Sequence, residues 1–257
     1  MKVVGIIQAR TGSTRFPNKV LEKINNKTLL EYYIERVKFS TSLDQIVLAT
    51  TVNPADNIIE EIAQKEGISY LRGSENDLLD RYYEAAKRNN ANIVVRLTSD
   101  DAFVDPDVID RAVKIFQDNY LQLDFVNNHL EPSYPEGLDV EVYAFDALAF
   151  AWRHSKLKSE REHVFLSITN YPEKYSIYTF KNNEDYSFLR WTVDYECDFE
   201  MVKKVYKKLY QPNRIFKYDD LIALYKTNPE IFEINSHIKR KEGVNKTIAE
   251  DKNEKSN

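Results

Sequence analysis

Short apolar stretches typical of strands alternate with amphipathic stretches typical of helices along the first part of the chain. The predicted strands cover 3–7, 45–50 and 93–97, and the predicted helices cover 29–39, 55–66 and 78–88. Such alternation is typical of βαβ units, whose parallel strands are buried beneath helices on both faces of a sheet. We therefore predict an α/β protein with a doubly wound sheet. Ligands of such sheets bind beyond the carboxyl ends of the strands.

The second half of the chain has a different pattern, with shorter strand-like pieces. Predicted strands lie at 138–143, 175–180 and 188–193, and predicted helices at 145–153 and 199–210. We predict one domain over residues 1–238, with an excursion at about 124–187. Residues 239–257 are polar and charged and lack periodicity, so they are predicted to form a disordered tail.

Composition and charge narrow the class of protein. The net charge of −5 over 257 residues argues against a protein that coats DNA or RNA, because such binding rests on a clustered cationic surface. Cys197 is the only cysteine, which excludes an intrachain disulfide and favours a reducing compartment. With no leader-like N-terminus and no apolar run near the roughly 20 residues that span a bilayer, the predicted location is cytoplasmic, without membrane insertion.

A basic loop follows the first predicted strand. Its small residues Gly12 and Ser13 let backbone N–H groups approach an anion closely. Arg10, Arg15 and Lys19 can neutralise the charge of a polyphosphate. The loop has neither the P-loop pattern nor the three spaced glycines of dinucleotide-binding proteins. We predict a cradle for a nucleoside triphosphate; the alternative is an ordinary solvated basic turn.

Six stretches of the chain resemble one protein family. They occur in the expected order, at 6–19, 72–82, 95–100, 135–142, 161–164 and 190–194. They are similar to cytidylyltransferases that activate acidic sugars, the acylneuraminate and 3-deoxy-manno-octulosonate cytidylyltransferases, and most of all to the spore-coat polysaccharide branch (SpsF). The chain departs from that branch at Asn18, where a glycine is usual, and at 99–102, where Ser-Asp-Asp-Ala replaces Gly-Asp-Cys-Pro.

The resemblance implies a nucleotide-diphospho-sugar-transferase-like (Rossmann-like) fold, with a mixed, mostly parallel sheet and helices on both faces. It implies that CTP, or another nucleoside triphosphate, binds to the first half, that Mg²⁺ is the cofactor, and that the protein is a homodimer. Expected catalytic residues are Arg10, Lys19 and Asp100, and expected metal ligands are Asp100 and Asp194. With the loop chemistry, the predicted nucleotide contacts are Ala9, Arg10, Gly12, Ser13, Arg15, Lys19, Arg72, Thr98 and Ser99.

The chemistry of the two aspartates agrees with a metal site. Magnesium prefers oxygen ligands and bridges one or two carboxylates to substrate phosphates. Asp100 and Asp194 each follow a predicted strand, at the end where ligands of an α/β sheet bind. The alternative is that each merely caps a turn or a helix, a role for which Asp101 and Asp105 are better candidates.

Acceptor contacts are predicted in the excursion, which is also expected to carry a subunit interface. Glu136, Asp139 and Glu141 offer carboxylates to the hydroxyl or amino groups of a sugar, and the last two share a face if the segment is a strand. Arg161 and His163 can receive a carboxylate or phosphate of the acceptor. A solvated helix face would explain these two residues equally well.

Together these features predict a nucleotidyltransferase, of the cytidylyltransferase type, that acts in cell-surface polysaccharide or glycan biosynthesis. An acceptor hydroxyl, or an acceptor phosphate oxygen, would attack the α-phosphate of CTP and release pyrophosphate. Two alternatives stay open at this point. One is a metal-dependent glycosyltransferase that uses a nucleotide-sugar donor, and the other is a non-catalytic nucleotide-binding subunit.

Overall fold

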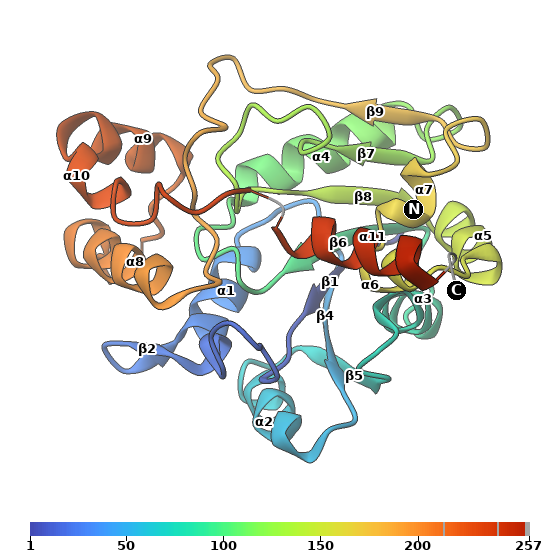
Figure 1. The fold of residues 1–257 in the computed structure, drawn as a ribbon, viewed down its shortest axis with the longest axis horizontal. Coiled ribbons are helices and arrows are strands. Elements are labelled where there is room, and N and C mark those ends of the chain that lie inside the picture. Colours follow the sequence, from blue (N-terminus) through green and yellow to red (C-terminus); the bar gives the residue numbers. More distant parts are fainter. Residues whose placement is uncertain (213, 241, 255–257) are drawn as a thin grey trace.

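The computed structural model describes residues 1–212, 214–240 and 242–254, and its centre is a seven-stranded sheet in the order β5-β4-β1-β6-β8-β7-β9 (Figure 1). Four of the strands are parallel to one another: β1 (Val3–Gln8), β4 (Gln45–Thr51), β5 (Ser69–Gly73) and β6 (Ile93–Thr98). The helices of this half are α1 (Leu29–Val37), α2 (Asn57–Lys65), α3 (Leu78–Arg88) and α4 (Pro106–Asp118). The predicted α/β fold is confirmed.

Alternating side chains of the buried strands build one apolar core on each face of the sheet. Ile7 of β1 belongs to the core that α1, α2 and α4 cover, whereas Val4 and Ile6 belong to the core that α3 covers. Local sequence signals determine where helices begin. Thr28 and Glu31 form a reciprocal capping box at the start of α1.

The second half adds three strands and makes the sheet mixed. β8 (Glu141–Ala144) runs antiparallel to β6 and to β7 (Phe125–Asn127), and β9 (Ile177–Thr179) runs parallel to β7 at the edge. The helices that follow β8 are α5 (Phe145–His154), α6 (Lys158–Glu162) and α7 (Leu166–Thr169).

The predicted strand at 188–193 is wrong. Leu189, Trp191 and Val193 are buried with the expected period of two, but no strand of the described residues pairs with the segment. It makes isolated bridges instead, from Arg190 to Glu136 and from Thr192 to Asp101. It therefore connects two loops of the sheet edge and does not extend the sheet.

The C-terminal part is helical. It contains α8 (Glu196–Leu209), α9 (Tyr218–Thr227), α10 (Pro229–Phe232) and α11 (Glu242–Glu254). In Figure 1, α8, α9 and α10 cluster at the left, whereas α11 lies apart from them, beside α6. The prediction of a disordered tail at 239–257 is wrong for the residues of α11, and 255–257 lie outside the described residues. The helix escaped prediction because it packs through buried polar residues, Thr247 and Asp251, and has no apolar stripe.

Short elements complete the first half: η1 (Lys19–Leu21), β2 (Lys23–Ile24), β3 (Lys27–Thr28) and η2 (Pro54–Asp56). In the part of the chain that the structure describes, none of the helices combines the length and the apolarity needed to cross a membrane.

Candidate active site

Two carboxylates and a lysine meet at the carboxyl edge of the sheet. Asp100 follows β6, Asp194 precedes α8, and Lys19 begins η1. Lys19 Nζ donates to Asp100 Oδ2 at 2.6 Å and to Asp194 Oδ1 at 2.9 Å. Asn18, where the related branch has glycine, adopts the left-handed φ of 60° that turns the chain into η1. The structure thus brings together the predicted catalytic lysine and both predicted metal ligands.

The charges of this cluster stabilise one another. Arg15 Nη2 lies 2.6 Å from Asp194 Oδ1, and Arg190 Nη2 lies 3.2 Å from Asp194 Oδ2. Burial opposes ionisation of Asp194, but Lys19, Arg15 and Arg190 outweigh burial and lower its pKa to about 2. Burial also opposes the charge on Lys19, yet Asp100 and Asp194 raise its pKa. Asp194 and Lys19 are therefore both charged at neutral pH.

Arg190 and Asp198 hold Asp194 in place, and sequence reasoning missed both. Arg190 pairs with Glu136 at 2.7 Å and with Asp198 at 2.9 Å. Asp198 Oδ2 also accepts from the backbone N–H groups of Asp194, at 2.8 Å, and Tyr195, at 2.9 Å. Signals were present: Arg190 opens the last family-like stretch, and Asp198 directly precedes the predicted helix at 199–210. Both residues position Asp194.

Gly137 allows the backbone of the segment 190–194, which carries Asp194, to approach the loop at the sheet edge closely. Its φ is +100°, and a Cβ atom there would lie 2.6 Å from Thr192 N and 2.7 Å from Trp191 C. Only glycine fits such a backbone contact. Val193 N donates to Asp100 O at 2.8 Å on the other side, so the strand-like segment that carries Asp194 is held between two loops.

The basic loop before Lys19 is hydrogen-bonded to the protein at one residue and exposed to solvent at others. Thr11 bonds to Asp56 through its backbone N–H at 2.7 Å and its hydroxyl at 2.6 Å. Arg10 and Gly12 are exposed, Ser13 is half-buried, and Ala9 is buried as the end of β1 enters the loop. Arg10 Nη1 lies 3.2 Å from Glu75 Oε1, a surface pair that a phosphate can displace.

Arg72, the predicted residue near the nucleobase, has its donors engaged. Its Nε donates to Thr51 O at 2.9 Å and its Nη2 to Asn53 O at 2.7 Å. Its Nη1 donates to Asn57 Oδ1 at 2.6 Å. These contacts tie β5 to the turn that follows β4, so Arg72 shapes the edge of the nucleotide half.

A cavity of about 240 Å³ opens beside the two carboxylates. The predicted residues that line it are Arg15, Thr98, Asp100, Glu136, Asp139, Glu141, His163 and Asp194. The additional lining residues include Gln8, Arg96, Asp101, His129, Phe165, Arg190, Thr192, Ile238, Lys239, Glu242 and Val244. Ser99 lies at the end of β6, where its N–H donates to Gln8 O at 3.2 Å. The cavity joins the predicted metal ligands to most of the predicted acceptor residues.

Asp101 and Asp105 have different roles, although both were candidates for caps. Asp105 Oδ1 accepts from Asp107 N at 2.8 Å at the start of α4, so its capping role is confirmed. Asp101 lines the cavity, where burial and the charges of Asp100 and Asp139 raise its pKa well above the usual range. The second acid beside Asp100 is thus a buried carboxyl group whose ionisation is disfavoured.

Glu141 and His163 both line the cavity, but they differ in their charge and in their hydrogen-bond partners. Glu141 is buried and accepts from Arg96 Nη1 at 2.6 Å, with His129 Nε2 at 3.1 Å. Burial opposes its ionisation, but Arg96, His129 and Tyr143 lower its pKa to about 2. Burial lowers the pKa of His163, so its imidazole is neutral at pH 7. Glu141 is a buried counterion, whereas His163 offers a neutral polar group.

Arg161, a predicted acceptor residue, lies outside the cavity lining. Its Nη2 lies 2.5 Å from Asp77 Oδ2, and its Nη1 donates to Trp152 O at 2.7 Å. Asp77 is the N-cap of α3, and its Oδ1 accepts from Asp80 N at 2.9 Å. Arg161 therefore joins α3, α5 and α6, which is neither of the two roles predicted for it.

Removal of this arginine tests that role. Arg161→Ala is expected to lower the free energy of unfolding by about 1.5–3 kcal/mol, because charge-assisted hydrogen bonds are lost and Asp77 stays half-buried. Urea denaturation of the variant measures the change. Arg153→Ala, an exposed position of α5, is the matched control and should leave stability unchanged. If Arg161→Ala instead lost nucleotide or acceptor binding at unchanged stability, Arg161 would be a binding residue of the active site.

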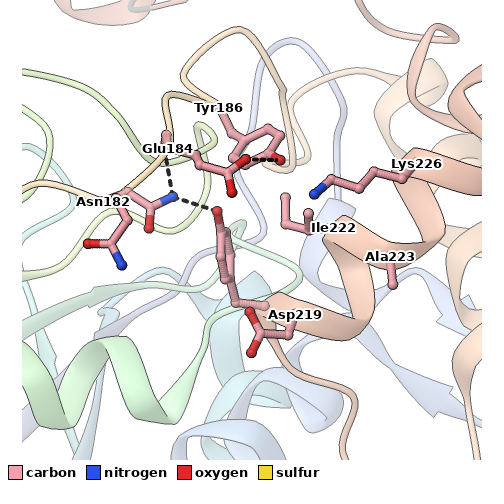
Figure 2. Close-up of a pocket in the computed structure, with 9 residues that line it drawn as sticks. Asn182, Glu184, Tyr186, Asp219, Ile222, Ala223 and Lys226 are labelled. Atoms are coloured by element: carbon pink, nitrogen blue, oxygen red, sulfur yellow. Dashed lines mark hydrogen bonds between the residues drawn. The ribbon is translucent and has the colours of Figure 1, made fainter.

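A second cavity, of about 450 Å³, lies between residues 182–186 and α9 (Figure 2). Its polar groups bond to one another: Asn182 Nδ2 donates to Tyr218 Oη at 2.5 Å, and Tyr186 Oη donates to Glu184 Oε2 at 2.7 Å. The described residues that line it include none of the predicted site residues. The smaller cavity beside Asp100 and Asp194 is therefore the candidate active site.

Two solved structures with this architecture are a cytidylyltransferase and a CMP-sugar-acid synthetase. A cytidylyltransferase from Leptospira borgpetersenii superposes with a TM-score of 0.86 at 37% identity, covering 90% of this chain and 97% of that one. The CMP:2-keto-3-deoxy-manno-octonic acid synthetase complexed with CTP superposes with a TM-score of 0.65 at 18% identity, covering 82% of this chain and 100% of that one. The fold is that of the Rossmann-like nucleotidyltransferases.

Sequence comparison gives the family. The cytidylyltransferase family model matches residues 4–228. The spore coat polysaccharide biosynthesis protein SpsF of Bacillus subtilis is 31% identical over 235 residues, which are 89% of this chain and 95% of that protein. The chain belongs to the cytidylyltransferase family, as the six family-like stretches predicted.

Proposed function

We propose that the protein is a Mg²⁺-dependent cytidylyltransferase that transfers CMP from CTP to a sugar or sugar-acid acceptor and releases pyrophosphate. The observation that carries the proposal is the convergence of Asp100, Asp194 and Lys19 beside an exposed basic loop. Membership of the cytidylyltransferase family supports CTP as the donor. The similarity to SpsF supports a role in cell-surface polysaccharide or glycan biosynthesis.

The donor set suits Mg²⁺. Two carboxylate oxygens, from Asp100 and Asp194, converge on one cation, Lys19 Nζ. Convergent carboxylate oxygens that can be completed by water and substrate phosphates are what this ion prefers. Asp100 and Asp194 would hold the ion, which would supply charge neutralisation for the phosphates of the donor.

The remaining roles belong to side chains of the chain itself. Arg10 and Arg15 lie on the exposed loop and neutralise the phosphates that leave as pyrophosphate. Lys19 stabilises the charge that develops on the same group. An acceptor oxygen attacks the α-phosphorus in line, and the bond from that phosphorus to the pyrophosphate oxygen breaks. The cavity beside Asp100 holds the acceptor for this attack.

Calorimetric titration with CTP, UTP, ATP and GTP, each with and without Mg²⁺, tests the proposal. We expect CTP to bind best, as membership of the family suggests. We also expect Mg²⁺ to strengthen the binding of CTP, because the ion offsets the repulsion between the two carboxylates and the phosphates. A panel of sugars and sugar acids with CTP should then give pyrophosphate.

Other outcomes distinguish the two alternatives. Binding of a nucleotide-diphosphate sugar without binding of any triphosphate would identify a glycosyltransferase. Metal-strengthened CTP binding without pyrophosphate release across the whole acceptor panel would identify a non-catalytic nucleotide-binding subunit.

A further inference from the structure

The wall of the active-site cavity includes a segment that lies beyond the family match. The match ends at residue 228, whereas Ile238, Lys239, Glu242 and Val244 all line the cavity that contains Asp100 and Asp194. In Figure 1 this segment leaves α10 and crosses to α11, which lies beside α6. The shared family core and this C-terminal segment therefore build the site together.

The segment is fixed at both ends of its course over the cavity. On one side Asn235 is buried, and its Nδ2 donates to Asp198 Oδ1 at 2.7 Å and to Arg190 O at 3.1 Å. Arg240 Nη2 then donates to Asp139 Oδ1 at 3.0 Å. Two residues that position the catalytic edge and one predicted acceptor residue thus anchor the segment.

On the other side α11 is tied to α6 and to the start of α8. Tyr195 Oη donates to Glu242 Oε2 at 2.8 Å, and Lys158 Nζ lies 2.6 Å from Glu250 Oε2. Thr247 is buried, and its hydroxyl lies 3.3 Å from His163 Nε2, a lining residue. These contacts hold the lining residues of the segment, Ile238, Lys239, Glu242 and Val244, in the wall of the cavity.

The charge of Lys239 sets it apart from the other cations of the cavity. Arg15 is paired with Asp194, Arg96 with Glu141, and Arg190 with Glu136, at 2.6, 2.6 and 2.7 Å. Within the described parts of the chain, Lys239 has no such ion pair, and its side chain is exposed. Lys239 is therefore the lining cation whose charge is available to a ligand.

We propose that Ile238, Lys239, Glu242 and Val244 form one wall of the acceptor subsite and that Lys239 binds an anionic group of the acceptor, a carboxylate or a phosphate. The inference rests on the proposed function and names the class of its second substrate. Ile238 and Val244 add apolar surface to the lining of the same cavity, which suits the carbon skeleton of a sugar derivative.

The test is a binding titration of the full-length protein loaded with Mg²⁺ and a CTP analogue that has a methylene bridge between the α and β phosphorus atoms. The probes are 3-deoxy-manno-octulosonate for the carboxylate, glucose 1-phosphate for the phosphate, and glucose as a neutral sugar. The variants are Lys239→Ala, Lys239→Arg and, as the matched control, Lys246→Ala at an exposed position of α11.

An anionic probe should bind to the wild type and lose about ten-fold in affinity in Lys239→Ala, because one charge-assisted hydrogen bond is removed. Lys239→Arg should restore binding, and Lys246→Ala should leave it unchanged. The probe that responds identifies the anionic group. Equal binding to Lys239→Ala and to the wild type, binding of glucose alone, or no binding of either anionic probe would overturn the role of Lys239.

The analogue itself separates this proposal from the proposed function. Its affinity should be the same in the wild type and all three variants, since the nucleotide loop lies on another element. Failure of the analogue to bind to the wild type would contradict the proposed function instead. A weaker affinity for the analogue in Lys239→Ala alone would place the lysine at the nucleotide and overturn its role at the acceptor.

Discussion

Asp100→Asn is expected to lower the rate of pyrophosphate release by about a thousand-fold or more. Asp100 supplies one of the two carboxylates that converge on Lys19 Nζ, and an amide in its place offers Mg²⁺ a neutral ligand. The same substitution should abolish the gain in CTP affinity that the proposed function expects from Mg²⁺. Pyrophosphate release and calorimetry measure these two effects, and the second does not depend on the identity of the acceptor.

Asp107→Asn is the matched control for this experiment. Asp107 is an exposed residue of α4 that pairs with Lys217 at the surface, away from the cavity lining. It should keep the wild-type rate and the wild-type metal dependence. A near-normal rate in Asp100→Asn would remove Asp100 from the mechanism, and a loss of activity in both variants would indicate an effect on the fold.

Glu141→Ala is expected to lower the free energy of unfolding by about 3–5 kcal/mol. The substitution removes the carboxylate that neutralises Arg96 within the buried cluster and leaves that guanidinium without its ion pair. Urea denaturation at pH 7 measures the change. Glu131→Ala, which breaks the exposed pair with Lys181, should change the stability by no more than about 1 kcal/mol. Equal effects of the two substitutions would contradict the role assigned to the buried pair.

The same carboxylate predicts how stability depends on pH. The pKa of Glu141 is about 2 in the folded protein, below the ordinary value of 4.5. A lowered pKa adds stability that is complete above the unfolded value and is lost as the pH falls through the folded one. Between about pH 4.5 and 2 the wild type should therefore lose its advantage over Glu141→Gln, as denaturation curves at several pH values would measure. A difference that stays constant over this window would contradict the lowered pKa.

The class of fold could be predicted because the parallel strands and their helices carry local patterns. The buried strand around Ile7 is a short continuous apolar run, and the amphipathic helices beside it have the helical period. The segment around Trp191 shows the limit of this reasoning. It alternates as a strand does, but alternation records burial on one side and does not show which backbone lies beside it.

The site was predictable in its residue types and less so in their contacts. Asp100 and Asp194 were predicted as metal ligands from the family resemblance, with which the chemistry of acids at strand ends agrees, but their convergence on Lys19 depends on tertiary structure. Arg161 illustrates the opposite outcome, since an arginine suited to an anion instead binds the N-cap of α3. Lys239 was missed because its segment, read as a polar tail, owes its position to contacts with distant residues.

The contacts of Lys19 also constrain the order in which the protein can fold. Its partners lie 81 and 175 positions away along the chain, so the second contact closes a much longer loop than the first. During synthesis the strands β1, β4 and β6 emerge before the segment that carries Asp194, and contacts of such large separation form late. A nascent chain is therefore expected to bring Lys19 to Asp100 early, and to Asp194 only after the C-terminal half has docked.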